Sequence, residues 1–397
     1  MATLSDILLP IVRRYISNSQ KFACLPFAWD KLHNKVVRVE KKTQILVKCG
    51  ILLHLFYVIW QILFLSNVPI SMIQKLEGVV ILFVFIAMLA FRLDWWADFG
   101  PMILINTIIA DGGKGHETAK FLQPSQGTQP PINKLVLTCI RLFCLLSELV
   151  TYTFPILIAV TGLIFPCKPP LLSSLVYTAI SQNCRPWRYD VICFDLKKIA
   201  IALVEFFISK QGTVTGMHYA VHSLVNGIIY LTIKINLLKT RGADAVRAFR
   251  EVQVLENFLN TNIRRRLFPI SMSVIPIVQI FVGFAILKMA HEDSINFLKL
   301  GMFGLVYLEV LLFNLIAVSA AAKVFNSSAS WLRGVKGNRA VGIEERDVAR
   351  DKVKRRAGKS CRPLRLQFGN NFVDRLTPLV IQEFCAVQTM SLILLSK

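Results

Sequence analysis

The sequence predicts an all-α membrane protein with seven transmembrane helices. Of its 397 residues, 54% are hydrophobic and only 18% are charged, and the mean hydropathy is +0.54. A soluble domain has about 45–50% apolar and about 25% charged residues. The excess is gathered into runs of roughly twenty residues, the helix length that crosses about 30 Å of hydrocarbon. We therefore expect residues 1–397 to form one seven-helix domain in a lipid bilayer.

Seven apolar runs are predicted to span the membrane. They are 45–65, 73–91, 134–165, 212–238, 267–289, 301–325 and 377–396. A shorter run, 101–110, is below spanning length and is predicted to lie at the membrane interface. Another, 197–209, is either an interfacial or extracellular helix or an extension of the fourth span.

The orientation follows from Lys and Arg, which accumulate on the cytosolic side of a membrane protein. One set of alternate segments holds 33 of these residues: 1–44, 92–134, 239–266 and 323–375. The other set holds five: 67–77, 165–195 and 290–300. This asymmetry predicts a cytosolic N-terminus, an extracellular C-terminus, a cytosolic segment at 1–44 and a basic cytosolic loop at 326–370.

The formal charge of +22 would suggest nucleic acid in a soluble protein. Here the charge lies between apolar runs, and no zinc finger or aromatic-basic strand accompanies it, so no nucleic-acid partner is expected. The sequence also lacks paired carboxylates, a nucleophile elbow and a metal cluster, which predicts no enzyme and no cofactor. His218 and His222 have the spacing of two metal ligands, but without a third ligand we expect them to line a polar cavity or to pack in the bundle.

Four polar residues inside the spans each need a partner, because polar groups are costly in hydrocarbon. Arg141 and Glu148 are seven residues apart on one helix face, so they either compensate each other or Arg141 extends to the inner membrane surface. Glu309 and Asn314 have no partner that the sequence identifies. They are candidates for a contact with a ligand or with a neighbouring helix.

The last span, 377–396, carries a stripe of residues three and four apart that share one face. The stripe consists of Gln382, Ala386, Thr389, Ile393 and Ser396. It would suit the wall of a pore with a hydrophobic constriction at Ile393, or polar residues that bond between packed helices. Thr377-Pro378 suits the start of this helix, since Thr can cap and Pro fits a first turn.

The nine cysteines include three in the segment predicted to be extracellular, the compartment in which disulfides persist. They are Cys167, Cys184 and Cys193. One disulfide among them is plausible, and the sequence leaves the pairing open.

The layout, together with the stretch "TMSLILLSK" at 389–397, resembles the insect gustatory and odorant receptor superfamily, particularly its divergent gustatory branches. The signature of that family is Thr-Tyr, five apolar residues and Gln-Phe in the last helix. Thr389 matches, whereas Met390 replaces the Tyr and Ser396-Lys397 replace Gln-Phe. Upstream, "FGNNFVDRLTP" resembles the approach to that helix. The resemblance in layout covers the whole chain.

The resemblance implies a chemosensory, taste-type receptor at the cell membrane that works as a ligand-gated non-selective cation channel. It implies four subunits, identical or related, around a pore lined by the last helix, and a pocket in each subunit for a small-molecule tastant. If the ligand enters from outside, six aromatic residues are candidates to contact it: Phe83, Tyr152, Phe154, Tyr219, Phe303 and Tyr307. The alternative is a membrane transporter of small solutes, although no pair of Gly/Pro-broken helices marks a midplane site.

Overall fold

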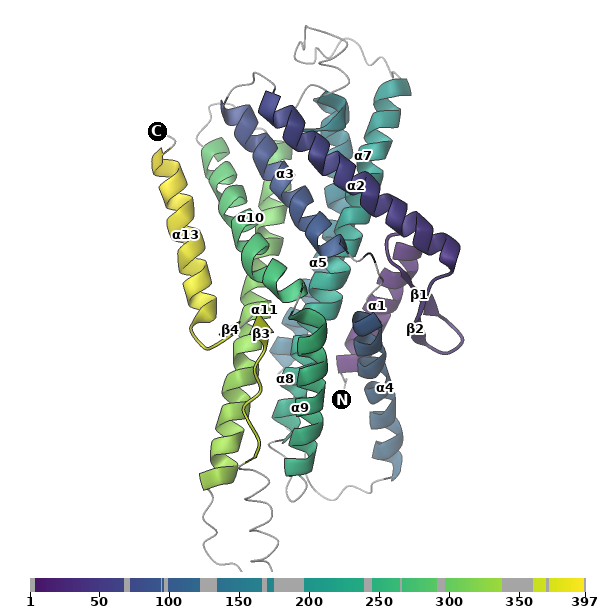
Figure 1. The fold of residues 1–397 in the computed structure, drawn as a ribbon, viewed down its shortest axis with the longest axis vertical. Helices are drawn as coiled ribbons and strands as arrows, with labels where there is room; N and C mark the ends of the chain where they lie inside the picture. The colour runs from purple at the N-terminus through teal and green to yellow at the C-terminus, as the bar shows by residue number, and fades with distance from the viewer. Residues whose placement is uncertain are drawn as a thin grey trace, which may run out of the picture.

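The computed structural model of the chain is an elongated helical bundle (Figure 1). It describes residues 4–67, 72–93, 95, 99–121, 134–165, 170–174, 196–238, 245–264, 266–290, 297–337, 360–368 and 371–395. Seven helices within these residues are long and apolar enough to cross a membrane, which confirms the predicted fold class. They are α2 (Lys41–Asn67), α3 (Met72–Arg92), α5 (Lys134–Ile164), the continuous α7–η1–α8, α10 (Leu267–Ala290), α11 (Phe297–Gly337) and α13 (Thr377–Leu395).

The fourth span is one continuous helix of 43 residues from Leu196 to Leu238. It consists of α7 (Leu196–Met217), a π-helical segment η1 (His218–Val225) and α8 (Asn226–Leu238). The run at 197–209 is therefore an extension of the span rather than a separate helix. Its most apolar window is 78% buried, against 50% or less for the other spans. Its burial places this helix in the centre of the bundle, where it packs most extensively on α5.

The segment before α2 is folded against the bundle. Helix α1 (Leu4–Lys21) buries Tyr15 and Ile16. The strands β1 (Phe27–Asp30) and β2 (Lys35–Arg38) form an antiparallel hairpin. The amide of Asn106 on α4 (Phe99–Phe121) bonds the backbone N–H and carbonyl of Val36, at 2.7 and 2.8 Å. Side-chain bonds thus hold the hairpin to α4, whose apolar part is too short to span.

Helix α11 continues beyond the predicted end of the sixth span at 325, and it reaches Gly337. The reason is packing: Trp331 stacks on Phe249 of α9 (Ala245–Ile263) with ring centroids 4.6 Å apart, and Leu332 is buried. The first part of the stretch 326–370 is therefore helix rather than loop. After it, residues 360–368 run along α9, and β3 (Gln367–Phe368) pairs with β4 (Asn371–Phe372).

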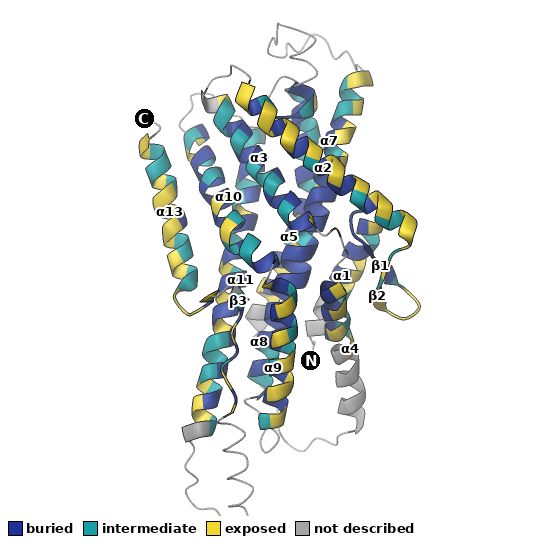
Figure 2. Ribbon diagram, in the orientation of Figure 1, coloured by how far each residue is buried: buried dark blue, intermediate teal, exposed yellow. Residues whose placement is uncertain are grey.

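Helix α13 lies at the edge of the bundle beside α10 and α11 (Figure 1). Only 6% of its apolar window is buried, and most of its length is exposed or half-buried in Figure 2. Its exposed side chains are apolar, among them Leu379, Val387 and Leu394. Apolar side chains that face away from the chain require lipid or another subunit to cover them.

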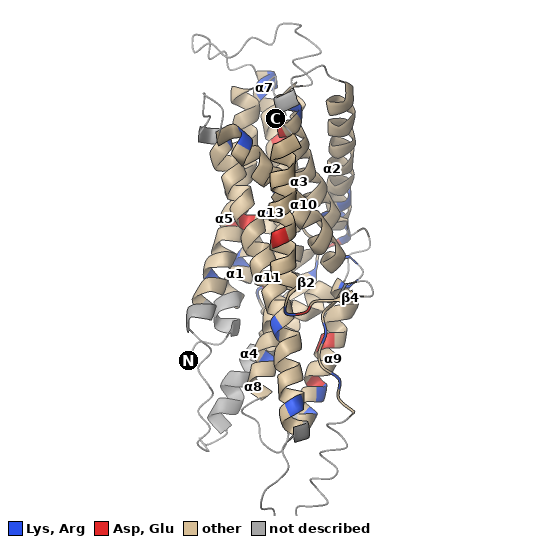
Figure 3. Ribbon diagram, turned by 90° about the vertical axis from the view of Figure 1, so that its left-hand side faces the viewer, with Lys and Arg blue, Asp and Glu red and all other residues tan. Residues whose placement is uncertain are grey.

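Charged residues are few along the membrane-spanning part of the bundle and more frequent on α9 and the nearby end of α11 (Figure 3). Together with the seven spans, this distribution is that of a multi-pass membrane protein. The cell membrane is its expected location.

Candidate functional site

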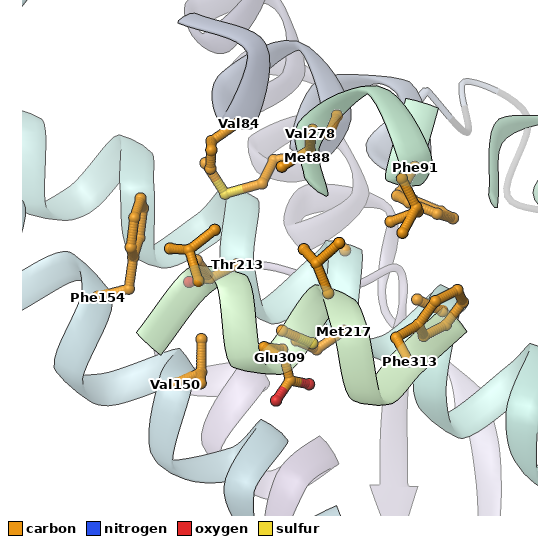
Figure 4. Close-up of a pocket in the computed structure, with 16 residues that line it drawn as sticks. Val84, Met88, Phe91, Val150, Phe154, Thr213, Met217, Val278, Glu309 and Phe313 are labelled. Carbon is orange, nitrogen blue, oxygen red and sulfur yellow. The ribbon is translucent and has the colours of Figure 1, made fainter. Parts of the chain in front are cut away.

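A cavity of about 110 Å³ lies among five helices in the middle of the bundle. Figure 4 shows side chains of α3, α5, α7, α10 and α11 converging on it. Its lining consists of Val84, Ala87, Met88, Phe91, Val150, Phe154, Thr213, Gly216, Met217, Ala220, Ile275, Val278, Val306, Glu309, Val310 and Phe313. An engineered cavity of about 150 Å³ holds benzene, so the space is of the order that a small ring compound needs.

The wall of the cavity is almost wholly carbon and sulfur. Three phenylalanines and two methionines dominate it, and Met sulfur makes favourable contacts with aromatic rings. The hydroxyl of Thr213 donates to the Ser209 carbonyl of its own helix, at 2.8 Å. Glu309 accepts a hydrogen bond from Ser147 at 2.6 Å, and its carboxylate points away from Val84 and Met88 (Figure 4). The cavity therefore favours apolar and aromatic ligands over charged ones.

Glycine at 216 keeps the cavity open. A Cβ atom at this position would have Met88 Cα, 4.0 Å away, as its nearest neighbour. At Gly212, one helical turn earlier, a Cβ atom would instead lie 3.1 Å from His54 and 3.2 Å from the Met88 sulfur. The π-helical segment begins directly after Met217, and π-helical turns occur frequently at functional sites.

Of the six aromatic residues predicted to contact ligand, Phe154 lines the cavity. Phe303 is buried elsewhere in the core, Phe83 stacks on Phe281 with centroids 4.7 Å apart, and Tyr307 lies against Gly283. The remaining two pack under cations: Lys210 Nζ lies 3.6 Å from the ring centroid of Tyr152, and Arg266 lies 4.7 Å from that of Tyr219. For all six, ligand contact stays a prediction.

Sequence reasoning missed most of the wall, including Met88, Phe91, Met217 and Phe313. Which face of a span turns inward depends on how the helices pack. The one available signal was the pair of glycines at 212 and 216, since small residues in a span mark close approach or open space.

Three of the polar residues expected inside the spans bond to other elements, namely Glu148, Glu309 and Asn314. Glu148 forms an ion pair with Arg14 of α1, whose Nε lies 2.6 Å from its carboxylate. Of the two alternatives for Arg141, compensation of Glu148 is therefore wrong, because α1 docks on α5 and brings Arg14 instead. The extension of Arg141 to the inner membrane surface stays a prediction. Asn314 donates to Gln279 of α10 at 2.7 Å, one of the two contacts expected for it.

His218 and His222 are fully buried in the bundle. Their ring centroids lie 6.2 Å apart, and the His222 ring centroid is 4.4 Å from that of Tyr15 on α1. Among the described residues, no group of three His, Cys, Asp or Glu side chains could hold a metal ion. These contacts are those of aromatic packing.

Along the predicted pore stripe of α13, two residues face α10 in the single chain. Gln382 accepts a hydrogen bond from Gln279 at 2.8 Å. The Thr389 hydroxyl donates to Cys385 O at 2.8 Å and lies 3.5 Å from Ile280 O. Ala386 is exposed and Ile393 half-buried, while Ser396 lies outside the described residues.

The three cysteines of the predicted extracellular segment, Cys167, Cys184 and Cys193, also lie outside the described residues. Their pairing stays a prediction.

Comparison with known proteins shows what this bundle is similar to. No family model and no curated protein matches the sequence. Among solved structures, the insect olfactory receptor OR5 from Machilis hrabei superimposes with a TM-score of 0.52 at 12% identity, over 97% of this chain and 98% of that one. Its complex with eugenol gives 0.53 at 11%, over 98% and 99%. The chain has the insect olfactory receptor fold.

The similarity is in the fold, and it extends over nearly the whole chain, so it includes all seven spans. In the insect olfactory receptor fold of this chain, α13 is the peripheral last helix and the cavity lies on the other side of α10 and α11. The helices α10 and α11 thus separate the cavity from α13.

Proposed function

We propose that the protein is a chemosensory receptor that acts as a ligand-gated, non-selective cation channel at the cell membrane. The observation that carries the proposal is the apolar cavity in the middle of a bundle with the insect olfactory receptor fold. The OR5 structure from Machilis hrabei contains eugenol, a small aromatic molecule. The resemblance of the last helix to gustatory receptors supports a taste-type role, with a tastant as the ligand.

The ligand class follows from the wall of the cavity. Three Phe rings and two Met sulfurs offer dispersion and ring contacts, and burial of apolar surface contributes about 25 cal/mol per Å². A charged ligand would lose its hydration without gaining a partner. We therefore infer a small, uncharged, largely aromatic molecule as the agonist.

The pore is proposed to form between subunits. The exposed apolar face of α13 needs a cover, and a ring of four subunits, identical or related, would supply one while leaving a central path. In this arrangement α13 lines the pore, with Ala386 and Ile393 as candidates. Gln382 and Thr389 are the part of the predicted stripe that contacts α10.

A cavity-filling substitution tests the proposal. Gly216→Leu places a side chain into the open space beside Met88, so it should reduce currents evoked by eugenol, benzaldehyde or toluene at least tenfold. The matched control is Gly301→Leu on α11, because Gly301 is exposed and a Cβ there meets nothing within 4 Å. Both variants are expressed in cultured cells and recorded by patch clamp, with surface expression measured in parallel.

Three outcomes are informative. Loss of response in Gly216→Leu with retention in Gly301→Leu supports the cavity as the ligand site. Wild-type responses in Gly216→Leu would remove the cavity from the proposal. Solute uptake without ligand-evoked current in the wild type would favour the transporter instead.

A further inference from the structure

Three amide side chains form a hydrogen-bonded chain across α11, α10 and α13. Asn314 Nδ2 donates to Gln279 Oε1 at 2.7 Å, and Gln279 Nε2 donates to Gln382 Oε1 at 2.8 Å. Gln279 uses its carbonyl oxygen for one neighbour and its NH₂ group for the other. The two bonds are therefore coupled: a rotation of the Gln279 amide that breaks one also disturbs the other.

The chain of amides begins at the wall of the cavity. Gln279 directly follows Val278, and Asn314 directly follows Phe313, both of which line the cavity. Gln279 and Asn314 are themselves buried, 3% and 1% exposed. In a buried apolar setting no water replaces a lost amide bond, so Gln279 and Asn314 have a strong preference to stay connected. Gln382, at the other end of the chain of amides, is half-buried.

The other polar contacts between α10 and α13 are longer than the Gln279–Gln382 bond. The Cys385 thiol lies 3.9 Å from Pro276 O, and the Thr389 hydroxyl lies 3.5 Å from Ile280 O. Pro276 also leaves α10 without one of its internal hydrogen bonds. A helix bends most easily at such a point, and this one lies between the cavity residue Ile275 and Gln279.

We propose that Gln279 is the positioning residue that transmits occupancy of the cavity to α13, through the chain Asn314–Gln279–Gln382. A ligand that presses on Val278 and Phe313 moves the backbone of α10 and α11 beside the two amides. Gln279 then carries the displacement to Gln382 because it holds both partners. The inference rests on the proposed function, since it assigns a route from that cavity to the channel-forming helix.

The test measures binding, gating and the position of α13 separately in the full-length protein. Binding of eugenol is followed by the rise in melting temperature of purified protein, and gating by patch-clamp current. The position of α13 is read from the rate at which N-ethylmaleimide labels Cys385, which is buried against α10. Mass spectrometry distinguishes this cysteine from the other eight.

Gln279→Leu should keep the apparent affinity for eugenol within about twofold and reduce the maximal current at least fivefold. In the wild type, eugenol should change the Cys385 labelling rate at least threefold, and in Gln279→Leu this change should disappear. Gln382→Leu should have the same effect. The double variant should reduce the maximal current no further than either single variant, because each of the three variants breaks the same chain of hydrogen bonds. Gln20→Leu, at an exposed amide on α1, should behave as the wild type.

The result that overturns the inference is a Gln279→Leu channel that gates and labels as the wild type does, or one that loses binding and gating together. If the reductions in maximal current caused by Gln279→Leu and Gln382→Leu multiplied in the double variant, the inference would also be overturned. The two residues would then act independently. A wild type that neither binds nor responds to eugenol, benzaldehyde or toluene overturns the proposed function, and the transmission with it. The two failures are thus distinguishable.

Discussion

Phe154 is expected to influence both the size of the cavity and the size of the ligand that it accepts. Its side chain is 3% exposed and lines the cavity from α5. Phe154→Ala should destabilise the protein, because truncating a buried Phe costs about 3–5 kcal/mol, and it should enlarge the cavity. We expect the preference to shift from toluene toward longer alkylbenzenes, measured as the ratio of their half-maximal concentrations.

The control for Phe154→Ala is Leu203→Ala on α7, where the side chain is 61% exposed. Surface changes of this kind usually stay within about 0.5 kcal/mol, and the ligand ratio should not move. An unchanged ratio in Phe154→Ala would remove this residue from the determinants of ligand size.

The sequence predicted the kind of residue at the site better than its position. Phe154 was among six aromatic candidates, yet Met88, Phe91 and Phe313 were missed, because a single sequence does not determine how a helix is rotated. Similarly, Asn314 was recognised as needing a partner, but its partner Gln279 lies 35 residues away on α10. Long-range pairs of this kind depend on packing, which hydropathy does not encode.

At the scale of elements, the segment 360–368 is held on α9 by side chains that bond its backbone. Glu256 accepts the N–H of Arg365 at 2.8 Å, and Asn260 donates to its carbonyl at 2.9 Å. Burial raises the pKa of Glu256 above its usual range, although the arginines 362 and 365 act in the opposite direction. The docked segment therefore depends on the protonation of one carboxyl group.

The sign of this dependence follows from linkage. The folded state binds the proton of Glu256 more tightly than the unfolded state, so stability is greatest below the unfolded pKa of about 4.3 and falls as pH rises through the raised pKa. Protection of the Arg365 amide from hydrogen exchange should accordingly decrease across this range. In Glu256→Gln the decrease should vanish, because a neutral amide keeps the acceptor oxygen without titrating.

Glu251→Gln on the same helix serves as the control for Glu256→Gln. The Glu251 side chain is 68% exposed, so its replacement should leave the pH dependence of Arg365 protection unchanged. A pH dependence that survives in Glu256→Gln would mean that another group causes it.

The start of α13 shows what local sequence predicts well. Thr377-Pro378 was expected to begin the helix, and α13 does begin at Thr377. The capping carboxylate comes from Asp374, which accepts the N–H groups of Leu376 and Thr377 at 3.1 and 3.0 Å. The hydrogen bond from the Thr377 hydroxyl, together with these two backbone bonds, lowers the pKa of Asp374. Helix ends follow from neighbouring residues, whereas the extent of α7 and α11 depended on tertiary packing.

At the scale of the whole molecule, the number of spans and the orientation rest on different physics. Each span follows from local hydropathy, which is why all seven were predicted. Orientation follows from 33 Lys and Arg in one set of connecting segments against five in the other. It describes which side of the membrane each segment faces, and the fold alone does not determine this. It is therefore a proposal: N-terminus cytosolic, and the far end of α13 extracellular.

An epitope tag after Lys397 tests this orientation. Antibody should label intact cells, because moving about thirty basic residues to the outer side would oppose the rule that sets topology. A second tag before Met1 is the matched control and should be labelled only after permeabilisation. If intact cells showed the N-terminal tag instead, the basic segments would face outward and the proposed cation path would have to be redrawn. If both tags appeared on one side, one of the seven helices would not cross, and α13, with 6% of its apolar window buried, would be the first candidate.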